Sequence, residues 1–156
     1  MTSTGLPPCG IYRTTQKLEE IPAGKLVYFH NHGEPGAGLY VPESWTQNRA
    51  NYSQRGVPIP GAWFAATLDP LAAEGFYRVR EKFHCCDKLC MEFQPEQLVQ
   101  LGYNGEADPI LFVPEITVHG FRVPENGTRI DRSRIARLAL LKVSLVTTGR
   151  DDQLLH

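Results

Sequence analysis

Three cysteines and one histidine lie close together in the second half of the chain, where residues 84–90 read HCCDKLC. Thiolate and imidazole groups at this spacing can bind a soft or borderline metal ion, and Zn²⁺ prefers four of them in a tetrahedron. The candidate sulfur ligands are Cys85, Cys86 and Cys90. The three residues between Cys86 and Cys90 differ from the two that are common in zinc-binding pairs, and no second cysteine pair follows.

This segment has three interpretations. In a zinc site, the three thiols would be joined by a histidine, either His84 or one of the pair His30 and His32. In a redox site, Cys86 and Cys90 would interconvert between dithiol and disulfide. In a purely structural role, the cysteines would be buried thiols that pack as small apolar side chains. The spacing alone leaves all three open.

A second group with metal-binding chemistry is the pair formed by His30 and His32. Residues two apart in a strand project from the same face of a sheet, so both imidazoles would be available to one metal ion. The alternative is that both side chains make hydrogen bonds in a hairpin turn. The pair is therefore a candidate metal site or a structural element of a turn.

A third group is basic. Residues 122–142 contain six basic and two acidic side chains, and Arg132, Arg134 and Arg137 lie closest together. Guanidinium groups bind phosphates well, so these three are candidate nucleic-acid contacts. No known nucleic-acid-binding motif accompanies them. The sequence therefore favours a solvated basic surface, with nucleic-acid binding as an alternative function.

Enzymes of several large classes are excluded by the absence of their motifs. The chain has no phosphate-binding loop, no dinucleotide-binding glycine pattern and no nucleophile elbow. We therefore expect a protein without catalytic activity, with a metal-dependent enzyme as the alternative if the cysteine or histidine groups bind metal.

The elements that must position these groups recur along the chain. Residues 26–43 match residues 98–115 at a constant offset of 72, with LV at the start of both segments and VPE at their ends. Upstream, GIYR at 10–13 matches GFYR at 75–78 at an offset of 65. The difference of seven residues indicates an insertion in the second segment, and this insertion contains the cysteines. The sequence predicts an internal duplication.

In each copy a turn leads into an LV strand, and a later apolar strand ends at a proline. The turns are PAGK at 22–25 and QPEQ at 94–97, and the later strands are LYVP at 39–42 and ILFVP at 110–114. This order resembles that of SH3-like small β-barrels. The resemblance implies a mainly β fold of two small barrels packed together. It also implies binding to other proteins, because most SH3-like domains are interaction modules.

Residues 44–55 interrupt the β pattern. Ser44 and Gln47 fit a capping box, and Trp45, Arg49 and Tyr52 recur at helical spacing, which predicts a helix at about 45–55. A second short helix is expected after Asp131.

The expected organisation follows from the repeat and its insertion. Its parts are a tail at 1–9, module 1 at 10–60, an apolar packed connector at 61–74, module 2 at 75–147 with the cysteine-containing insertion at 84–97, and a tail at 148–156.

The composition is that of a globular protein. The chain has 156 residues, a formal net charge of −1, 42% hydrophobic residues and 21% charged residues. It has no secretory signal at its start and no apolar run long enough to span a membrane, so we expect a cytoplasmic location. The expected function is that of an interaction module or assembly subunit, with a protein partner or further copies of the chain. Zinc binding is the first alternative.

Overall fold

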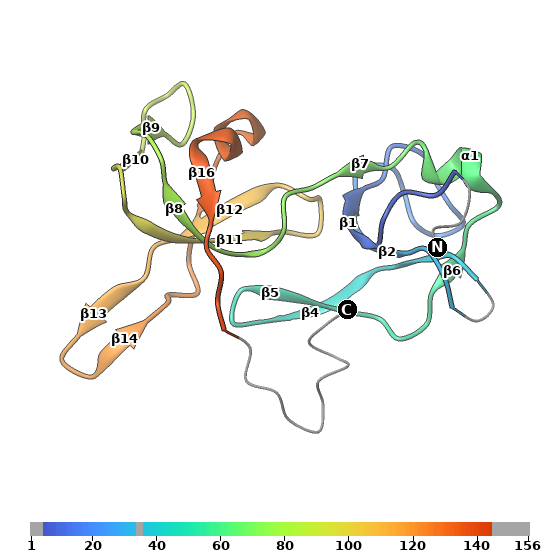
Figure 1. The fold of residues 1–156 in the computed structure, drawn as a ribbon, viewed down its shortest axis with the longest axis horizontal. Helices are drawn as coiled ribbons and strands as arrows, with labels where there is room; N and C mark the ends of the chain where they lie inside the picture. The colour runs from blue at the N-terminus through green and yellow to red at the C-terminus, as the bar shows by residue number, and fades with distance from the viewer. Residues whose placement is uncertain (1–4, 34–35, 145–156) are drawn as a thin grey trace.

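The fold is described by a computed structural model, which covers residues 5–33 and 36–144. The chain is mainly β, as the sequence predicts, and it contains two five-stranded sheets (Figure 1). In the first sheet the strands have the order β6-β3-β2-β1-β7. Their bounds are β1 (Gly10–Arg13), β2 (Leu26–His30), β3 (Gly38–Tyr40), β6 (Val57–Pro58) and β7 (Asp69–Pro70).

The second sheet has the order β15-β12-β11-β8-β16. Its strands are β8 (Gly75–Val79), β11 (Leu98–Tyr103), β12 (Pro109–Phe112), β15 (Thr128–Arg129) and β16 (Leu138–Leu140). The central strand β2 of the first sheet pairs with β1 and β3, the central strand β11 of the second sheet pairs with β8 and β12, and all of these pairs are antiparallel.

The two sheets also have the same register. Gly10 of β1 lies opposite Phe29 of β2, and Gly75 of β8 lies opposite Leu101 of β11. These partners are related by the offsets of 65 and 72 that relate the two sequence segments. Side chains at equivalent positions therefore face equivalent sides of their sheets, because faces alternate along a strand.

Neither sheet closes on itself. Among the described residues, the outermost strands of the first sheet, β6 and β7, each pair with one neighbour, and the same is true of β15 and β16 in the second sheet. The sequence resemblance implied closed SH3-like barrels. The structure corrects this point, because both five-stranded units are open sheets.

The helix predicted at about 45–55 is absent, and a β-hairpin takes its place. The hairpin consists of β4 (Pro42–Thr46) and β5 (Arg49–Tyr52). Its two turn residues, Gln47 and Asn48, have φ angles of 51° and 68°, as a tight two-residue hairpin turn requires. Ser44 caps no amide, because its hydroxyl accepts a hydrogen bond from the Asn51 side chain instead.

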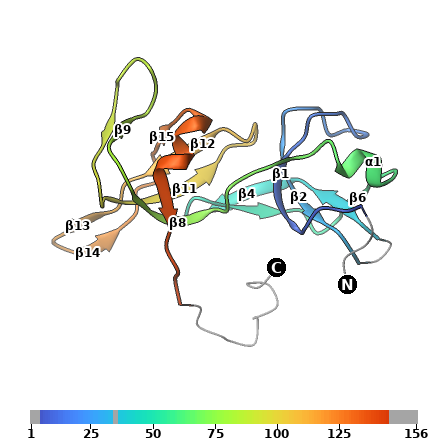
Figure 2. The ribbon, with the colours of Figure 1, turned by 45° about the horizontal axis from the view of Figure 1, so that its top comes forward.

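A second hairpin follows the second sheet. It consists of β13 (Glu115–Thr117) and β14 (Gly120–Arg122), and it follows β12 as the β4–β5 hairpin follows β3. The surroundings of the two hairpins differ (Figures 1 and 2). The β4–β5 hairpin runs alongside the second sheet, whereas the β13–β14 hairpin projects away from it.

Each sheet has its own buried core. The first core contains Val27, Phe29 and Leu39, and the second contains Val99, Leu101 and Leu111. The segment between the two sheets forms α1 (Ala62–Ala65), contributes β7, and buries Phe64 in the first core.

The cysteine-containing insertion forms a further small hairpin from β9 (Phe83–His84) and β10 (Glu92–Phe93). The short helix expected after Asp131 is a 3₁₀ helix, η1 (Arg132–Arg137). Within the described part of the chain, no helix has the length and apolar character needed to cross a bilayer. The predicted tail at 148–156 lies outside the described residues.

Candidate metal centres and a candidate interaction surface

The three cysteines of the insertion lie on one tight loop, residues 85–91, which we call the cysteine loop. It begins where the β9–β10 pairing ends, and the amide of Cys85 donates to the carbonyl of Met91 at 2.9 Å. A turn then follows, in which the amide of Leu89 donates to the carbonyl of Cys86 at 3.0 Å and Leu89 has a φ of 56°. The turn folds Cys90 back, and the three sulfurs lie within 4.8 Å of one another.

The sulfur geometry of the cysteine loop is close to that of a tetrahedral metal site. The sulfurs of Cys85 and Cys86 are 3.6 Å apart. Two thiolates that bind one zinc ion with bonds of about 2.3 Å at tetrahedral angles lie about 3.8 Å apart. The distance between these two sulfurs therefore matches that of two ligands of one ion.

The local backbone favours a thiolate at Cys86. The amide of Lys88, the thiol of Cys85 and the amide of Cys90 all donate toward this sulfur, and they lower the pKa of Cys86. Negative charge on Cys86 in turn raises the pKa of Cys90. The two thiols therefore titrate as a pair in which Cys86 loses its proton first.

His84 does not join the sulfur group in the described structure. Its Nε2 lies 3.3 Å from the Glu92 carboxylate on the paired strand. Of the three cysteines, only Cys85 is buried, and Cys90 is exposed. The interpretation of these residues as buried, inert thiols therefore fits Cys85 alone.

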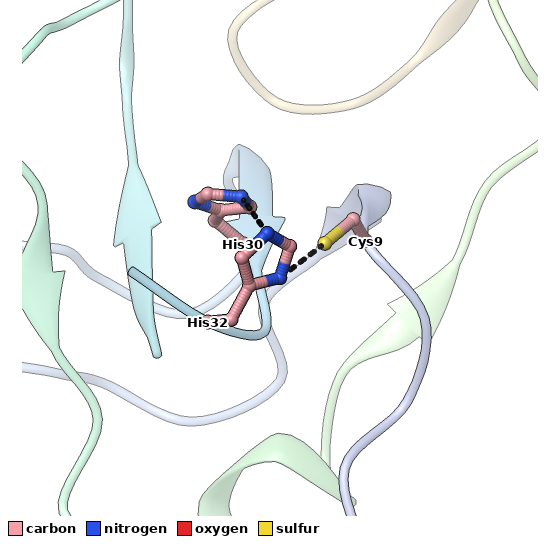
Figure 3. A group of neighbouring side chains, drawn as sticks. All are labelled: Cys9, His30 and His32. Atoms are coloured by element: carbon pink, nitrogen blue, oxygen red, sulfur yellow. Dashed lines mark hydrogen bonds between the residues drawn. The ribbon is translucent and has the colours of Figure 1, made fainter. Parts of the chain in front are cut away.

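The histidine pair lies against a third residue, Cys9, which sequence reasoning missed. His30 ends β2, and Cys9 directly precedes β1. Because Gly10 pairs with Phe29 in the antiparallel ladder, Cys9 arrives beside the end of β2. Figure 3 shows both imidazoles and the thiol gathered there. We call Cys9, His30 and His32 the Cys9 cluster, and its donor atoms lie within 4.8 Å of one another.

One signal in the sequence could have revealed Cys9. The offset of 65 placed residues 10–13 in a strand, and the LV strand at 26–29 is its antiparallel neighbour. Pairing those two strands in register brings residue 9 opposite residue 30. The internal repeat indicates where the strands lie but not which residues pair between them. It therefore does not connect Cys9 with the histidines.

Carboxylates accompany the basic group of the second sheet. The guanidinium of Arg134 lies 3.1 Å from the carboxylate of Asp87, and that of Arg137 lies 3.7 Å from Glu81. Arg134 is also 3.9 Å from Asp131. Two of the three candidate phosphate-binding arginines are therefore paired within the chain, which weakens the case for a nucleic-acid site.

The β4–β5 hairpin is docked on the second sheet by polar contacts. The side-chain amide of Asn48 donates to Gln100 Oε1 at 2.9 Å, and Gln100 Nε2 donates to the carbonyl of Gln47 at 3.0 Å. The Trp45 indole donates to the carbonyl of Tyr103 at 2.9 Å. A Cβ at position 102 would lie 2.7 Å from the carbonyl oxygen of Asn48. The glycine there permits the close approach.

The β13–β14 hairpin carries apolar side chains into solvent. Ile116 is 81% exposed, Val118 is 96% exposed and Phe121 is 56% exposed. A cluster of large exposed apolar groups is unusual on a monomeric protein and is typical of an interaction surface.

Comparison of the chain with protein-family models, with curated proteins and with solved structures found no significant match.

Proposed function

We propose that this protein is a non-catalytic assembly subunit that binds further copies of itself head to tail through the β13–β14 hairpin. In this proposal the chain consists of two divergent copies of one SH3-related module. The observation that carries it is the contrast between two equivalent hairpins. The β4–β5 hairpin is docked on the second sheet, whereas Ile116, Val118 and Phe121 of the β13–β14 hairpin are exposed.

The equivalence of the sheets specifies where the exposed hairpin would bind. The β4–β5 hairpin contacts the face of the second sheet that carries Gln100 and Gly102. At an offset of 72, the equivalent positions of the first sheet are Tyr28 and His30, so a hairpin that binds there would pack against their side chains and not approach the backbone as Asn48 does at Gly102. The β4–β5 hairpin docks on the next sheet along the chain, but the described residues contain no third sheet on which the β13–β14 hairpin could dock. In this proposal it therefore binds the first sheet of another copy.

The chemistry of the two faces supports this pairing. Within the chain, a hairpin with the polar tip residues Gln47 and Asn48 meets a sheet face with Gln100. The face proposed to receive the apolar hairpin is aromatic: the ring of His30 is 6.4 Å from that of Tyr28 and 6.5 Å from that of Tyr40. All three of these side chains are partly accessible.

A head-to-tail contact of this kind uses two different surfaces. Such heterologous contacts produce closed rings or open filaments, depending on the rotation between neighbours. The proposal therefore predicts assembly that increases with concentration, in place of a fixed symmetric dimer.

Sedimentation velocity over a range of concentrations tests the proposal. We expect the unmodified chain to form oligomers and the Val118→Ser, Phe121→Ser double variant to remain monomeric. Val143→Ser is the matched control, because Val143 is 61% exposed but lies outside both hairpins, and this variant should assemble normally. A chain that is monomeric at every concentration, or a double variant that still assembles, would contradict the proposal.

Photo-crosslinking tests the position of the contact. A photoreactive residue in place of Val118 should crosslink to β2 or β3 of another copy, near Tyr28 and Tyr40. Crosslinks that lie elsewhere on the chain would reject the proposed face even if oligomers form.

A second candidate function is zinc binding by the cysteine loop. It is supported by the grouping of three sulfurs within 4.8 Å and by the lowered pKa of Cys86, to which the amide of Lys88 contributes most. Three thiolates leave one position of a tetrahedral zinc ion for a further ligand.

Elemental analysis of the reduced protein tests this function. We expect the Cys86→Ser, Cys90→Ser variant to hold one zinc ion per chain fewer than the unmodified protein, and His119→Ala to hold the same amount, because His119 lies on the exposed turn of the β13–β14 hairpin. Less than about 0.1 zinc per chain after zinc is added to the unmodified protein would exclude the site.

A further inference from the structure

We propose that Cys9, His30 and His32 form a second metal site, which binds Zn²⁺ through one sulfur and two nitrogens and leaves a fourth position open. This inference does not depend on the proposed assembly or on the cysteine loop. The site differs from the cysteine loop in its donors and in its place in the fold, because it lies at the end of the β1–β2 ladder in the first sheet.

The donor atoms are already near metal-binding distances. His30 Nε2 lies 3.1 Å from His32 Nε2, and two nitrogens on a tetrahedral zinc ion lie about 3.3 Å apart. The Cys9 sulfur lies 3.8 Å from the other ring nitrogen of His32, Nδ1. With one donor atom taken from each side chain, all three lie within 4.8 Å of one another.

Asn31 contacts two members of the cluster, Cys9 and His32. Its backbone amide donates to the Cys9 sulfur at 3.3 Å. Its side-chain oxygen lies 2.7 Å from His32 Nδ1. A proton on Nδ1 directed at this oxygen leaves Nε2 as the metal-binding atom, which is the usual arrangement of a histidine ligand and its outer partner.

Strand pairing in the first sheet fixes the position of Cys9 relative to His30. The Gly10–Phe29 pair fixes Cys9 beside the end of β2, and the Asn31 side chain also donates to the carbonyl of Pro7 at 3.0 Å. The segment before β1 is therefore tied to the segment after β2 on both sides of Cys9. Ligands held by paired strands lose little conformational entropy when a metal binds.

The exposure of the cluster indicates an open site. Cys9 and His30 are partly buried and His32 is exposed, so solvent reaches the donors from the His32 side. Three protein ligands with one accessible position are typical of zinc sites that exchange a water or bind an external ligand. One thiolate and two imidazoles also suit zinc better than a hard cation such as Mg²⁺.

The decisive experiment is a zinc titration of the reduced, metal-free full chain that carries Cys86→Ser and Cys90→Ser, so that the cysteine loop cannot contribute. We expect one zinc per chain in calorimetry. Cys9→Ser and His32→Ala should each weaken binding by about 10-fold or more, and His119→Ala should leave the affinity unchanged. Co²⁺ should give a sulfur-to-metal absorption band that Cys9→Ser abolishes.

Three results would overturn the proposal. The first is an absence of zinc binding in the Cys86→Ser, Cys90→Ser chain, and the second is an unchanged zinc affinity in His32→Ala. The third is a loss of zinc affinity in His119→Ala that equals the loss in His32→Ala. His32 is exposed, so its variant should keep its fold, and circular dichroism verifies this. Repeating the titration with Val118→Ser and Phe121→Ser added separates the site from the assembly, because zinc binding should persist in a chain that no longer associates.

Discussion

The side-chain amide of Asn48 donates a 2.9 Å hydrogen bond to the side-chain oxygen of Gln100, which lies 52 residues further along the chain. Asn48 also donates to the carbonyl of Pro124 at 3.0 Å. Gln100 is one of the few buried polar residues of the described chain, with 4% of its surface exposed. This contact attaches the β4–β5 hairpin to the second sheet and joins the two halves of the protein.

Asn48→Ala should therefore destabilise the protein by about 1–3 kcal/mol, because it leaves the buried Oε1 of Gln100 without its hydrogen-bond donor. Asn48→Gly also removes the side-chain hydrogen bonds, but glycine tolerates the positive φ of 68° at this position. Comparison of the two variants therefore distinguishes the backbone preference of the turn from the contribution of the hydrogen bonds. Denaturant unfolding should show a lower free energy of unfolding for both variants, and the decrease should be larger for Asn48→Ala. Asn126→Ala, at an exposed position, is the control. A fully stable Asn48→Gly would show that the side-chain hydrogen bonds contribute little.

Gly102→Ala should loosen the same contact by steric conflict. The added Cβ would lie 2.7 Å from the backbone oxygen of Asn48 and 3.2 Å from the Phe112 ring, and overpacking of this kind costs about 1–3 kcal/mol. Gly105→Ala is the matched control, since the nearest atom to its Cβ is the Lys25 ammonium at 3.8 Å. Thermal unfolding should show a lower midpoint for Gly102→Ala only. Equal midpoints for the two variants would contradict the close approach.

Glu74 should make stability depend on pH. Burial raises the pKa of Glu74 above its ordinary value of 4.5, and the hydrogen bond from the Ala50 amide opposes the shift only in part. A carboxyl whose pKa is raised by folding stabilises the protein below its unfolded pKa, and this contribution is lost as the pH rises through the folded pKa. Glu74→Gln should therefore lose less stability than the unmodified chain as the pH rises from 4.5.

Urea unfolding at a series of pH values measures this difference. Glu125→Gln removes an exposed negative charge and is the control for a general effect of charge. A Glu74→Gln chain whose stability follows the same pH profile as the unmodified chain would show that burial of this carboxyl has no energetic consequence.

Cys86 should be the most reactive thiol of the cysteine loop. Its pKa is lowered chiefly by the amide of Lys88, and that of Cys90 is raised by the charge on Cys86. Since the thiolate is the nucleophile, limited alkylation of the metal-free protein should modify Cys86 before Cys90, as peptide mass spectrometry would show. The rate at Cys86 should fall as the pH is lowered through its pKa. Faster modification of Cys90 would contradict this order, and added zinc should protect both residues.

Much of the β structure could be predicted from local pattern. The LV strands at 26–27 and 98–99 and the apolar strands that end near Pro42 and Pro114 are formed. These segments combine apolar and aromatic residues with turn residues at both ends, and such patterns specify strands without reference to distant parts of the chain. The two sequence offsets also coincide with the observed registers.

The helix predicted at 45–55 failed because local and tertiary preferences competed. Ser44 and Gln47 fit a capping box, but a helix there would lose the contacts that Trp45 and Asn48 make with the second sheet. The carbonyl of Gln47 and the side chain of Asn48 meet Gln100 from a hairpin turn. That partner lies more than fifty residues away in sequence, so local pattern contains no information about it.

Of the two candidate metal sites, one could be predicted from the sequence and the other could not. The seven residues HCCDKLC already placed three sulfurs on one loop, because residues so close in sequence stay close in any fold. The grouping of Cys9 with His30 and His32 required the pairing of β1 with β2, since twenty residues separate Cys9 from His30. The contrast between a docked and an exposed hairpin likewise exists only in the assembled chain, because burial is a property of what packs against a segment and not of the segment alone.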